Sequence, residues 1–569
     1  MLGLMQDWPL LCHRIIDHAA ANAGERRVIS RSIEGPMHTT NYIEIRQHAL
    51  RVAQRLERDG IRLGDRVATL AWNTWRHLES WYGILGAGAV YHTVNPRLFT
   101  DQIVWIINHA EDRVLMTDVT FLPLLEKIAD RVPTIERTIV FCDAAHMPVT
   151  SLGNAVPYEE WLAEADGDFA WRSFDENTAA GMCYTSGTTG NPKGVVYSHR
   201  SNVLHAMAAL RRDMIGLSGS DIAMPVVPLF HANGWAIGFA APMAGAALIL
   251  PGPKLDGPSI YQLLTDYKVT CTAGVPTVWL ALLQELEKTG GKLPYLRRVV
   301  IGGSACPRAM ISTFQDVYDV EVTHAWGMTE MSPLGTTCSL KPEYAGLKGD
   351  PLLDILQKQG HSPFGVEMKI TDDEGRRMPW NGKTFGRLKV RGPAIAKTYF
   401  KDDSNILDEE GFFDTGDVGT IDRYGYLNIT DRSKDVIKSG GEWISSIEVE
   451  PSVIPKSPRP RSSACGIRSG MSGLCSSSCL SRGRRRAEKS CWRSSRARSP
   501  NGGCQTTSLS SPKSRTPRPE RFKKRRCARS LRITCCRAPQ REFYSARRNE
   551  NRGKWFHISH CNKLMARCN

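Results

Sequence analysis

The chain has 569 residues, a formal net charge of +16, 41% hydrophobic residues and 23% charged residues. These values are typical of a globular protein with room for several domains, and no run of about 18 apolar residues is present to span a membrane. The N-terminal residues also lack the basic segment, apolar stretch and cleavage site of a secretory signal. We therefore expect a cytoplasmic protein with no integral membrane segment.

Charge and cysteine content both change at about residue 450. Residues 451–569 contain 30 Lys and Arg against 4 Glu and no Asp, so residues 1–450 carry a net charge of −10. An acidic main part does not favour nucleic-acid binding. Ten of the 16 cysteines also follow residue 450. The other six show no paired spacing, which fits a reducing compartment and indicates no metal site.

Short β-branched runs alternate with amphipathic stretches from about Arg66. In chain order, the pattern predicts strand 66–72, helix 73–88, strand 90–94, helix 99–111 and strand 113–118. Further strands, each followed by a loop and a helical stretch, are predicted at 138–141, 180–185, 222–228, 247–252, 297–303 and 320–327. Strands that are apolar on both faces indicate an α/β fold with parallel sheets covered by helices. From about Gly386, short runs between Gly turns predict a small β unit that closes the large domain.

Residues 184–194, with the sequence YTSGTTGNPKG, lie between a predicted strand and a helix predicted at about 201–210. Glycines let backbone amides approach an anion, hydroxyls add donors, and Lys193 adds positive charge. The loop is therefore suited to phosphate, and a plain polar turn is the alternative. It is not a P-loop, because Pro192 precedes the lysine and Gly194 follows it.

This loop is nearly identical to the signature loop of the adenylate-forming (AMP-binding) superfamily, which contains acyl-CoA synthetases, peptide-synthetase adenylation domains and luciferases. The resemblance covers most of residues 30–450 and continues, in chain order, through FH at 230–231, GGSA at 302–305, WGMTE at 326–330, TGD at 415–417 and DRSKDVIKSGGEWIS at 431–445. Within the superfamily, stretches such as NPRLF, INHAED and HAWGMTE are most similar to bacterial medium- and long-chain fatty-acid CoA ligases.

The resemblance implies a two-step, ATP-dependent reaction. A fatty-acid carboxylate attacks the α-phosphate of ATP to give acyl-adenylate and pyrophosphate, and the thiol of coenzyme A then displaces AMP. Mg²⁺ and basic groups are expected to neutralise the phosphate charge. The implied partners are a fatty acid, ATP and CoA, and a homodimer is left open as the assembly state.

The resemblance also assigns roles to matching residues. Thr185 and Glu330 are the implied magnesium ligands, and Thr329 is the implied hydroxyl at the α-phosphate. Asp417 matches the ribose ligand, with Arg432 beside it. The remaining implied nucleotide contacts are Lys193 with Ser186, Gly187, Thr188, Thr189 and Gly190 in the loop, and Gly302, Gly303, Ala325 and Trp326 around the adenine. Taken singly, such residues are more often turns, helix starts or core.

Two further residues are matched to the acyl and thiol sites. His231 resembles the family histidine at the meeting point of the two tunnels, although an isolated histidine is more often a satisfied core residue. Trp235 resembles the gate tryptophan of long-chain members. Small residues near it fit a tunnel or tight helix packing, so the acyl chain length stays open. Lys434 matches the hinge, and the loop that contacts adenylate and pantetheine contains Lys438, Gly440, Gly441, Glu442 and Trp443.

The predicted domains are an AMP-binding domain at 1–431, and a hinge with the start of a C-terminal domain at 432–450. Residues 451–569 contain 21 Ser, 23 Arg and 10 Cys and no period of 2 or 3.6, so we expect them to be disordered. The family's small α/β domain, with its catalytic lysine, is not recognisable there. An Arg/Ser-rich nucleic-acid tail is disfavoured by ten cysteines without zinc-ligand spacing.

Another reading frame restores family-like sequence in this tail. Joining the third base of each codon to the next two bases, with free synonym choice, allows VGHPEVAEAAVIGV from 452–465, DERPLLLVV from 471–479 and KWWLPDDVVVVAEIPHTATGKIQK from 501–524. All three use one frame, and the lysine codon of TGK would straddle Glu520 and Arg521. We therefore interpret 451–569 as an out-of-frame product. The alternatives for function are an aryl- or short-acid CoA ligase and a nucleotide-binding protein with little turnover.

Overall fold

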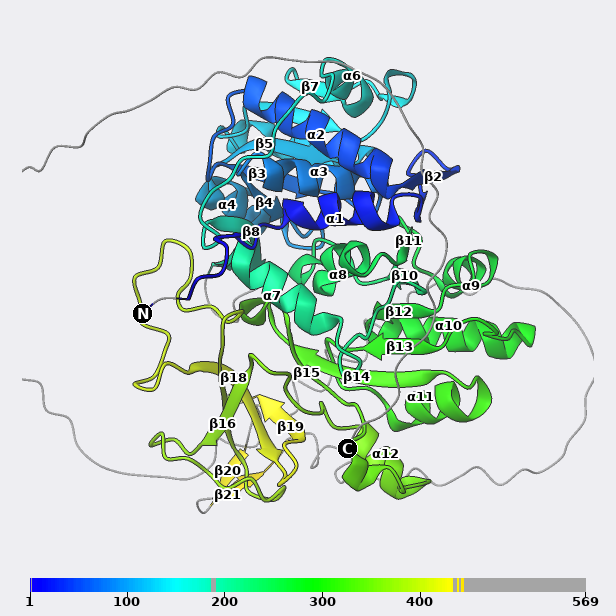
Figure 1. Cartoon of the computed structure of the whole chain (residues 1–569), viewed down its shortest axis with the longest axis vertical. Helices are drawn as coiled ribbons and strands as arrows, with labels where there is room; N and C mark the ends of the chain where they lie inside the picture. The colour runs from blue at the N-terminus through cyan, green and yellow to red at the C-terminus, as the bar shows by residue number, and fades with distance from the viewer. Residues whose placement is uncertain (2, 186–190, 433–436, 440–441, 445–569) are drawn as a thin grey trace, which may run out of the picture. The chain divides into compact units, whose positions relative to one another are not determined.

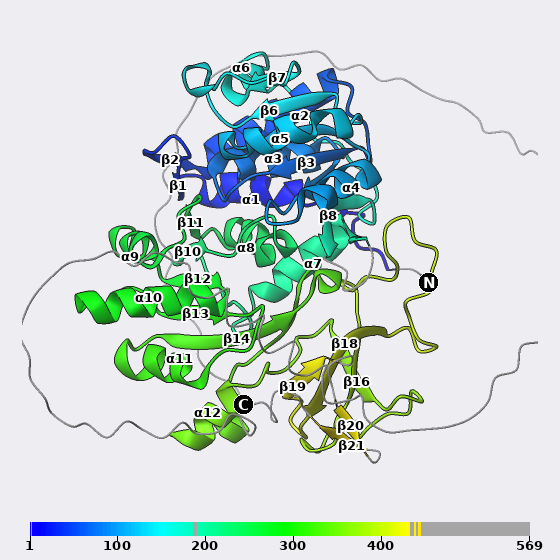
Figure 2. The same ribbon diagram turned by 180° about the vertical axis from the view of Figure 1, so that it is seen from behind.

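Two large, mostly parallel sheets covered by helices dominate the part of the chain that the structure describes (Figure 1). The computed structural model describes residues 1, 3–185, 191–432, 437–439 and 442–444, which all lie within a unit that ends at Arg459. Figure 2 shows the same elements from behind. The predicted α/β class with parallel sheets is confirmed.

The first sheet contains the strands predicted from the N-terminal third of the chain. In spatial order they are β7 (Ala155–Pro157), β6 (Arg137–Val140), β5 (Asp112–Thr117), β3 (Arg66–Leu70), β4 (Val90–Thr93), β8 (Ala179–Thr185) and β9 (Lys193–Ser198). Its helices include α2 (Tyr42–Arg58), α3 (Trp75–Gly86), α4 (Thr100–Ala110), α5 (Leu122–Ile128) and α6 (Tyr158–Ala163).

Alternate residues of β3 explain why helices cover both faces of this sheet. Val67 belongs to a core cluster with Leu78 of α3, whereas Ala68 and Leu70 belong to a second cluster with Ile103 of α4. Successive side chains of a strand point to opposite faces, so an apolar run buries both of them. The α3 helix begins where the Thr74 side chain accepts a hydrogen bond from the His77 amide, as an N-cap residue does.

The second sheet has eight strands and shares a core cluster with the first. In spatial order they are β15 (Leu334–Thr337), β14 (Glu321–Gly327), β13 (Arg298–Ile301), β12 (Cys271–Gly274), β10 (Ile222–Pro225), β11 (Ala247–Leu250), β1 (Arg27–Arg31) and β2 (Met37–Asn41). The other helices are α1 (His13–Ala23), α7 (His199–Ala209), α8 (Ile237–Ala244), α9 (Gly257–Asp266), α10 (Pro276–Thr289), α11 (Arg308–Ser312) and α12 (Asp350–Leu356). Among the described residues, none of these helices is long and apolar enough to cross a membrane.

The predicted small β unit is an antiparallel sheet of four strands, β16 (Glu367–Thr371), β17 (Gly386–Arg391), β18 (Phe413–Ile421) and β19 (Leu427–Arg432). It starts earlier than the Gly-turn pattern indicated, because β16 precedes Gly386. A separate two-stranded pair, β20 (Ile437–Ser439) and β21 (Glu442–Ile444), follows it. The proposed boundaries at 431 and 450 stay predictions.

The signature loop leads into a strand before it reaches a helix, which the sequence pattern did not predict. Strand β9 pairs antiparallel with β8, so that Thr185 lies opposite Lys193. Helix α7 begins only at His199, after the strand ends. The described residues on either side of the loop, Thr185 and Lys193, are therefore held together by the β8–β9 ladder.

Candidate active site

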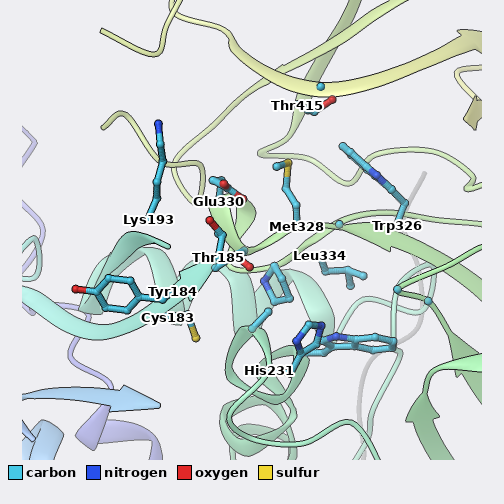
Figure 3. Close-up of a pocket in the computed structure, with 18 of the residues that line it drawn as sticks. Cys183, Tyr184, Thr185, Lys193, His231, Trp326, Met328, Glu330, Leu334 and Thr415 are labelled. Carbon is cyan, nitrogen blue, oxygen red and sulfur yellow. The ribbon is translucent and has the colours of Figure 1, made fainter. Parts of the chain in front are cut away.

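A cavity of about 920 Å³ lies at the carboxyl ends of several parallel strands. Its lining includes Thr185 at the end of β8, the Gly302–Gly303 pair after β13, and the segment that follows β14. Loops at this edge of a parallel sheet are where ligands of open α/β folds bind. Figure 3 shows 18 of the lining residues.

One wall of the cavity combines a hydroxyl, a carboxylate and an ammonium group. Thr185, Glu330 and Lys193 line it (Figure 3). A second hydroxyl, that of Thr329, lines it as well. Glu330 is 6% exposed, and this burial raises the pKa of its carboxyl group above the ordinary value. One carboxylate oxygen accepts a hydrogen bond from the Tyr399 hydroxyl at 2.8 Å. The turn at Thr329 is held by a hydrogen bond to its backbone, since the Tyr197 hydroxyl donates to the Thr329 carbonyl at 2.7 Å.

These groups fit a magnesium ion in chemistry. Mg²⁺ prefers oxygen ligands and is bound in nucleotide sites by one or two protein oxygens together with phosphates and water. Thr185 and Glu330 supply such oxygens to the same cavity. In the described part of the chain, no three His, Cys, Asp or Glu side chains gather into a metal site.

The opposite wall connects an indole, a carboxylate and a guanidinium. Trp326 Nε1–H donates to Asp417 Oδ2 at 2.9 Å, and Arg432 Nε lies 2.9 Å from Asp417 Oδ1. Trp326 and Arg432 line the cavity, whereas Asp417 stands behind them at 4% exposure. Burial raises the pKa of Asp417, while Arg432 and the Trp326 hydrogen bond act in the opposite direction.

The glycine pair after β13 packs directly against Trp235. A Cβ atom on Gly302 would lie 2.8 Å from the Ala325 carbonyl oxygen and 3.1 Å from Trp235 Cη2. Gly303 has a φ of +81°, in the left-handed region that favours glycine. No side chain larger than hydrogen fits at Gly302 without a shift, so the indole covers bare backbone here.

His231 and Trp235 flank an unusual backbone segment. Residues 232–236 all have positive φ, between 36° and 61°, although only one of them is glycine. Burial lowers the pKa of His231, and nearby Arg97 adds to this effect. The side chain of Asn233 fixes the segment to the first sheet, because its amide nitrogen donates to the Tyr91 hydroxyl at 2.9 Å and its oxygen accepts from the Thr93 hydroxyl at 3.1 Å.

The structure brings eleven of the 23 predicted site residues to this one cavity, and Asp417 is buried beside it without lining it. Eleven of them line it: Thr185, Lys193, His231, Trp235, Gly302, Gly303, Ala325, Trp326, Thr329, Glu330 and Arg432. The predicted residues that lie outside the described ones are Ser186, Gly187, Thr188, Thr189, Gly190, Lys434, Gly440 and Gly441. Lys438, Glu442 and Trp443 lie in β20 and β21, where only the backbone is described.

Sequence reasoning missed several lining residues, notably Tyr399, Arg387 and Asp414. Arg387 Nε donates to Asp414 Oδ2 at 2.9 Å, which joins β17 to the start of β18. Both residues lie in segments that the sequence pattern predicted only as parts of the small β unit, with no functional role. Tyr399 follows β17 and belongs to none of the motifs that carry the family resemblance.

The sequence profile of a family described as AMP-binding enzyme matches residues 16–400. The chain belongs to this family. It is 48% identical over 450 residues to a 3-methylmercaptopropionyl-CoA ligase of Ruegeria pomeroyi, covering 79% of this chain and 84% of the relative. It is 45% identical to a medium-chain-fatty-acid–CoA ligase of Ectopseudomonas oleovorans over 79% of this chain and 82% of the relative. A long-chain-fatty-acid–CoA ligase of Thermus thermophilus is 44% identical over 78% and 81%.

Solved structures agree with this membership. A fatty acyl CoA synthetase of Mycobacterium tuberculosis matches with a TM-score of 0.66 and 25% identity, covering 79% of this chain and 83% of that one. The anthranilate CoA ligase AuaEII matches with a TM-score of 0.68 at 24% identity, over 78% and 82%, and shows the fold alone. The predicted adenylate-forming fold and the likeness to bacterial fatty-acid CoA ligases are confirmed.

Proposed function

We propose that this chain derives from an ATP-dependent, AMP-forming acyl-CoA ligase that acts on a medium- or long-chain fatty acid. The observation that carries the proposal is the single cavity that joins a phosphate-type wall at Thr185, Lys193 and Glu330 to a nucleotide-type wall at Trp326 and Arg432. The similarity to curated CoA ligases supports the same reaction class.

In the proposed reaction, each wall has its own task. Thr185 and Glu330 would hold Mg²⁺, which neutralises phosphate charge when it is bound. Lys193 adds a fixed positive charge, and the Thr329 hydroxyl donates to the α-phosphate. Trp326 offers an aromatic face to adenine, while Asp417, held by Arg432, is suited to accept from ribose hydroxyls. His231 lies where carboxylate and thiol would meet.

A short thioether acid is a second candidate substrate, favoured by two specific observations. One is the 48% identity to the 3-methylmercaptopropionyl-CoA ligase. The other is the packing of Trp235 against Gly302, since this tryptophan resembles the gate residue of long-chain members and would close the acyl site in this position. The indole must move aside for a long chain and can stay in place for a short one.

The residues after 450 require a separate proposal. We retain the interpretation that a frameshift has replaced the C-terminal domain, which supplies a lysine to the reaction in this family. The alignment to the Ruegeria relative leaves about a fifth of this chain unmatched, and this supports the frameshift interpretation. We also propose a reducing compartment such as the cytoplasm, because the six cysteines of the described residues are all free.

Pyrophosphate release measured with a series of acids tests the proposed function. ATP, Mg²⁺ and CoA are supplied with propionate, 3-methylmercaptopropionate, octanoate and palmitate. Release that depends on octanoate or palmitate supports the main proposal, and release confined to 3-methylmercaptopropionate, with or without propionate, supports the second. Nucleotide binding without acid-dependent release from either this chain or its frame-restored form contradicts both.

A further inference from the structure

Residues 393–402 form a segment after β17 that touches both sides of the phosphate-type wall, and we call it the strap. The Phe400 amide donates to the Gly194 carbonyl at 2.8 Å, at the start of β9. The Ala396 amide donates to the Glu330 carbonyl, also at 2.8 Å. One short segment is thus hydrogen-bonded to the strand that carries Lys193 and to the turn that carries Glu330.

Contacts outside the cavity anchor the strap at both ends. Near its start, the Ser332 hydroxyl donates to the Ala394 carbonyl at 2.9 Å. Near its end, Lys401 Nζ donates to the His109 carbonyl at 2.9 Å and lies 2.7 Å from a carboxylate oxygen of Glu111. These anchors involve no proposed substrate contact, so the strap is positioned by the fold itself.

Tyr399 lies between the two charged groups of the wall. Its hydroxyl donates to Glu330 Oε1 at 2.8 Å. Lys193 Nζ lies 4.6 Å from the centre of its ring, a cation–π distance, and 3.7 Å from Asp402 Oδ2. The ammonium group is therefore balanced by the ring and by Asp402, while the carboxylate is held by a neutral donor.

Lys193 and Glu330 carry opposite charges and line the same cavity, so an ion pair between them would compete with ligand binding. In a direct ion pair, Lys193 and Glu330 would neutralise each other. The lysine would then be less available to phosphate, and the glutamate less available to a cation. A neutral hydroxyl on one carboxylate oxygen orients the group and leaves the second oxygen for a metal ion. Outer groups of this kind are known to tune the ligands of metal sites.

We propose that Tyr399 is a positioning residue that holds Glu330 ready for the cation of a Mg·ATP complex and keeps it from pairing with Lys193. The inference rests on the proposed function, since it requires that Glu330 receives Mg²⁺. It adds to that function a residue that acts through Glu330 rather than on the substrate. Loss of the hydroxyl weakens Mg·ATP binding and leaves AMP binding nearly unchanged, because AMP brings no β,γ-phosphates with their cation.

A double-mutant cycle on the full chain tests the proposal. Dissociation constants for Mg·ATP and for AMP without metal are measured by calorimetry for the wild type, Tyr399→Phe, Glu330→Gln and the double variant. Tyr344→Phe is the matched control, because Tyr344 is also half-buried and donates to a carboxylate, that of Asp422 at 3.1 Å, outside the cavity lining. We expect Tyr399→Phe to weaken Mg·ATP about tenfold, AMP less than twofold, and Mg·ATP no further in the Glu330→Gln background.

The outcomes separate this inference from the proposed function. Unchanged Mg·ATP affinity, an equal loss for AMP, or the same loss in the Glu330→Gln background would overturn the role of Tyr399 while ATP binding by the wild type stands. A wild type that binds neither nucleotide would remove the proposed function and the inference with it. If Tyr399→Phe does not fold, Ser332→Ala, which releases one strap anchor, is expected to weaken Mg·ATP selectively and to a smaller extent. If Ser332→Ala binds Mg·ATP as tightly as the wild type does, the proposed role of the strap is wrong.

Discussion

Glu330 is a carboxylate whose burial costs free energy, and it lines the proposed active-site cavity. Taking a charged group out of water is unfavourable, and the raised pKa of Glu330 records that cost. Tyr399 returns one hydrogen bond, and the strap holds the backbone of Glu330 in place. A carboxylate retained in such surroundings points to a functional rather than a stabilising role.

Replacement of Glu330 by Gln is predicted to affect activity much more than folding. The amide keeps the shape and the Tyr399 hydrogen bond but loses the charge offered to Mg²⁺. We expect pyrophosphate release to fall by about a hundredfold in a frame-restored chain. The melting temperature should stay within a few degrees of the wild type. Wild-type turnover in this variant would remove Glu330 from the proposed metal site, and exposed Glu409→Gln serves as the control.

The same substitution should change how stability depends on pH. Because the pKa of Glu330 is raised in the folded state, that state binds the proton more tightly than the unfolded chain does. The stability contribution is therefore present below the unfolded pKa and is lost as pH rises through the folded pKa. We expect Glu330→Gln to gain stability relative to wild type between about pH 5 and pH 8, measured by urea unfolding at both values. A difference that shrinks with rising pH would contradict the burial argument.

Asp417→Asn is predicted to weaken nucleotide binding. The variant keeps the acceptor for Trp326 Nε1–H but loses the charge that pairs with Arg432. It also exchanges one acceptor oxygen for a donor, which a ribose diol does not match. We expect AMP to bind about tenfold more weakly in calorimetry, with little loss of stability. AMP affinity equal to the wild type would show that the ribose lies elsewhere.

At the scale of elements, five of the seven strands of the first sheet were predictable, all but β7 and β9, while the shape of the site was not. Apolar runs such as 66–72 and 113–118 are buried on both faces, so their pattern is set by local sequence. Strand β9 was missed because Gly194, its second residue, and Pro192 just before it are typical of a turn. Tyr399 was missed because its role arises from a contact with Glu330, 69 positions away, which no periodicity encodes.

The left-handed segment 232–236 provides a prediction at this scale. Ala236 has a φ of 61°, where an L-residue with a Cβ is strained by about 1–2 kcal/mol. Ala236→Gly should relieve that strain, at a smaller entropic cost, and raise the free energy of unfolding by about 0.5–1 kcal/mol. Ala240→Gly, inside helix α8, should lower it by about 1 kcal/mol. Urea unfolding of both variants checks the contrast, and equal destabilisation would argue against a left-handed Ala236.

At the scale of the molecule, the net charge and the family resemblance both differ between residues 1–450 and residues 451–569. The net charge of −10 belongs to residues 1–450, and the basic excess belongs to residues 451–569. The family profile lies wholly within the first part, at 16–400. The described residues that line the proposed active-site cavity all belong to that part, so we expect nucleotide binding to be separable from full turnover in this chain.

Restoring the reading frame after Glu450 is predicted to restore acyl-CoA formation. The family resemblance implies that the small domain brings a lysine to the forming adenylate, so the proposed replacement of this domain would remove positive charge at the α-phosphate. Loss of one such group costs about 3 kcal/mol, or roughly a hundredfold in rate. The chain as written should therefore bind AMP within about threefold of the restored chain, through Trp326, Asp417 and Arg432, yet form acyl-CoA at least about a hundredfold more slowly. Acyl-CoA is measured by chromatography with the best acid of the series for both chains. Equal and robust rates would show that residues 451–569 do not stand in place of a catalytic domain.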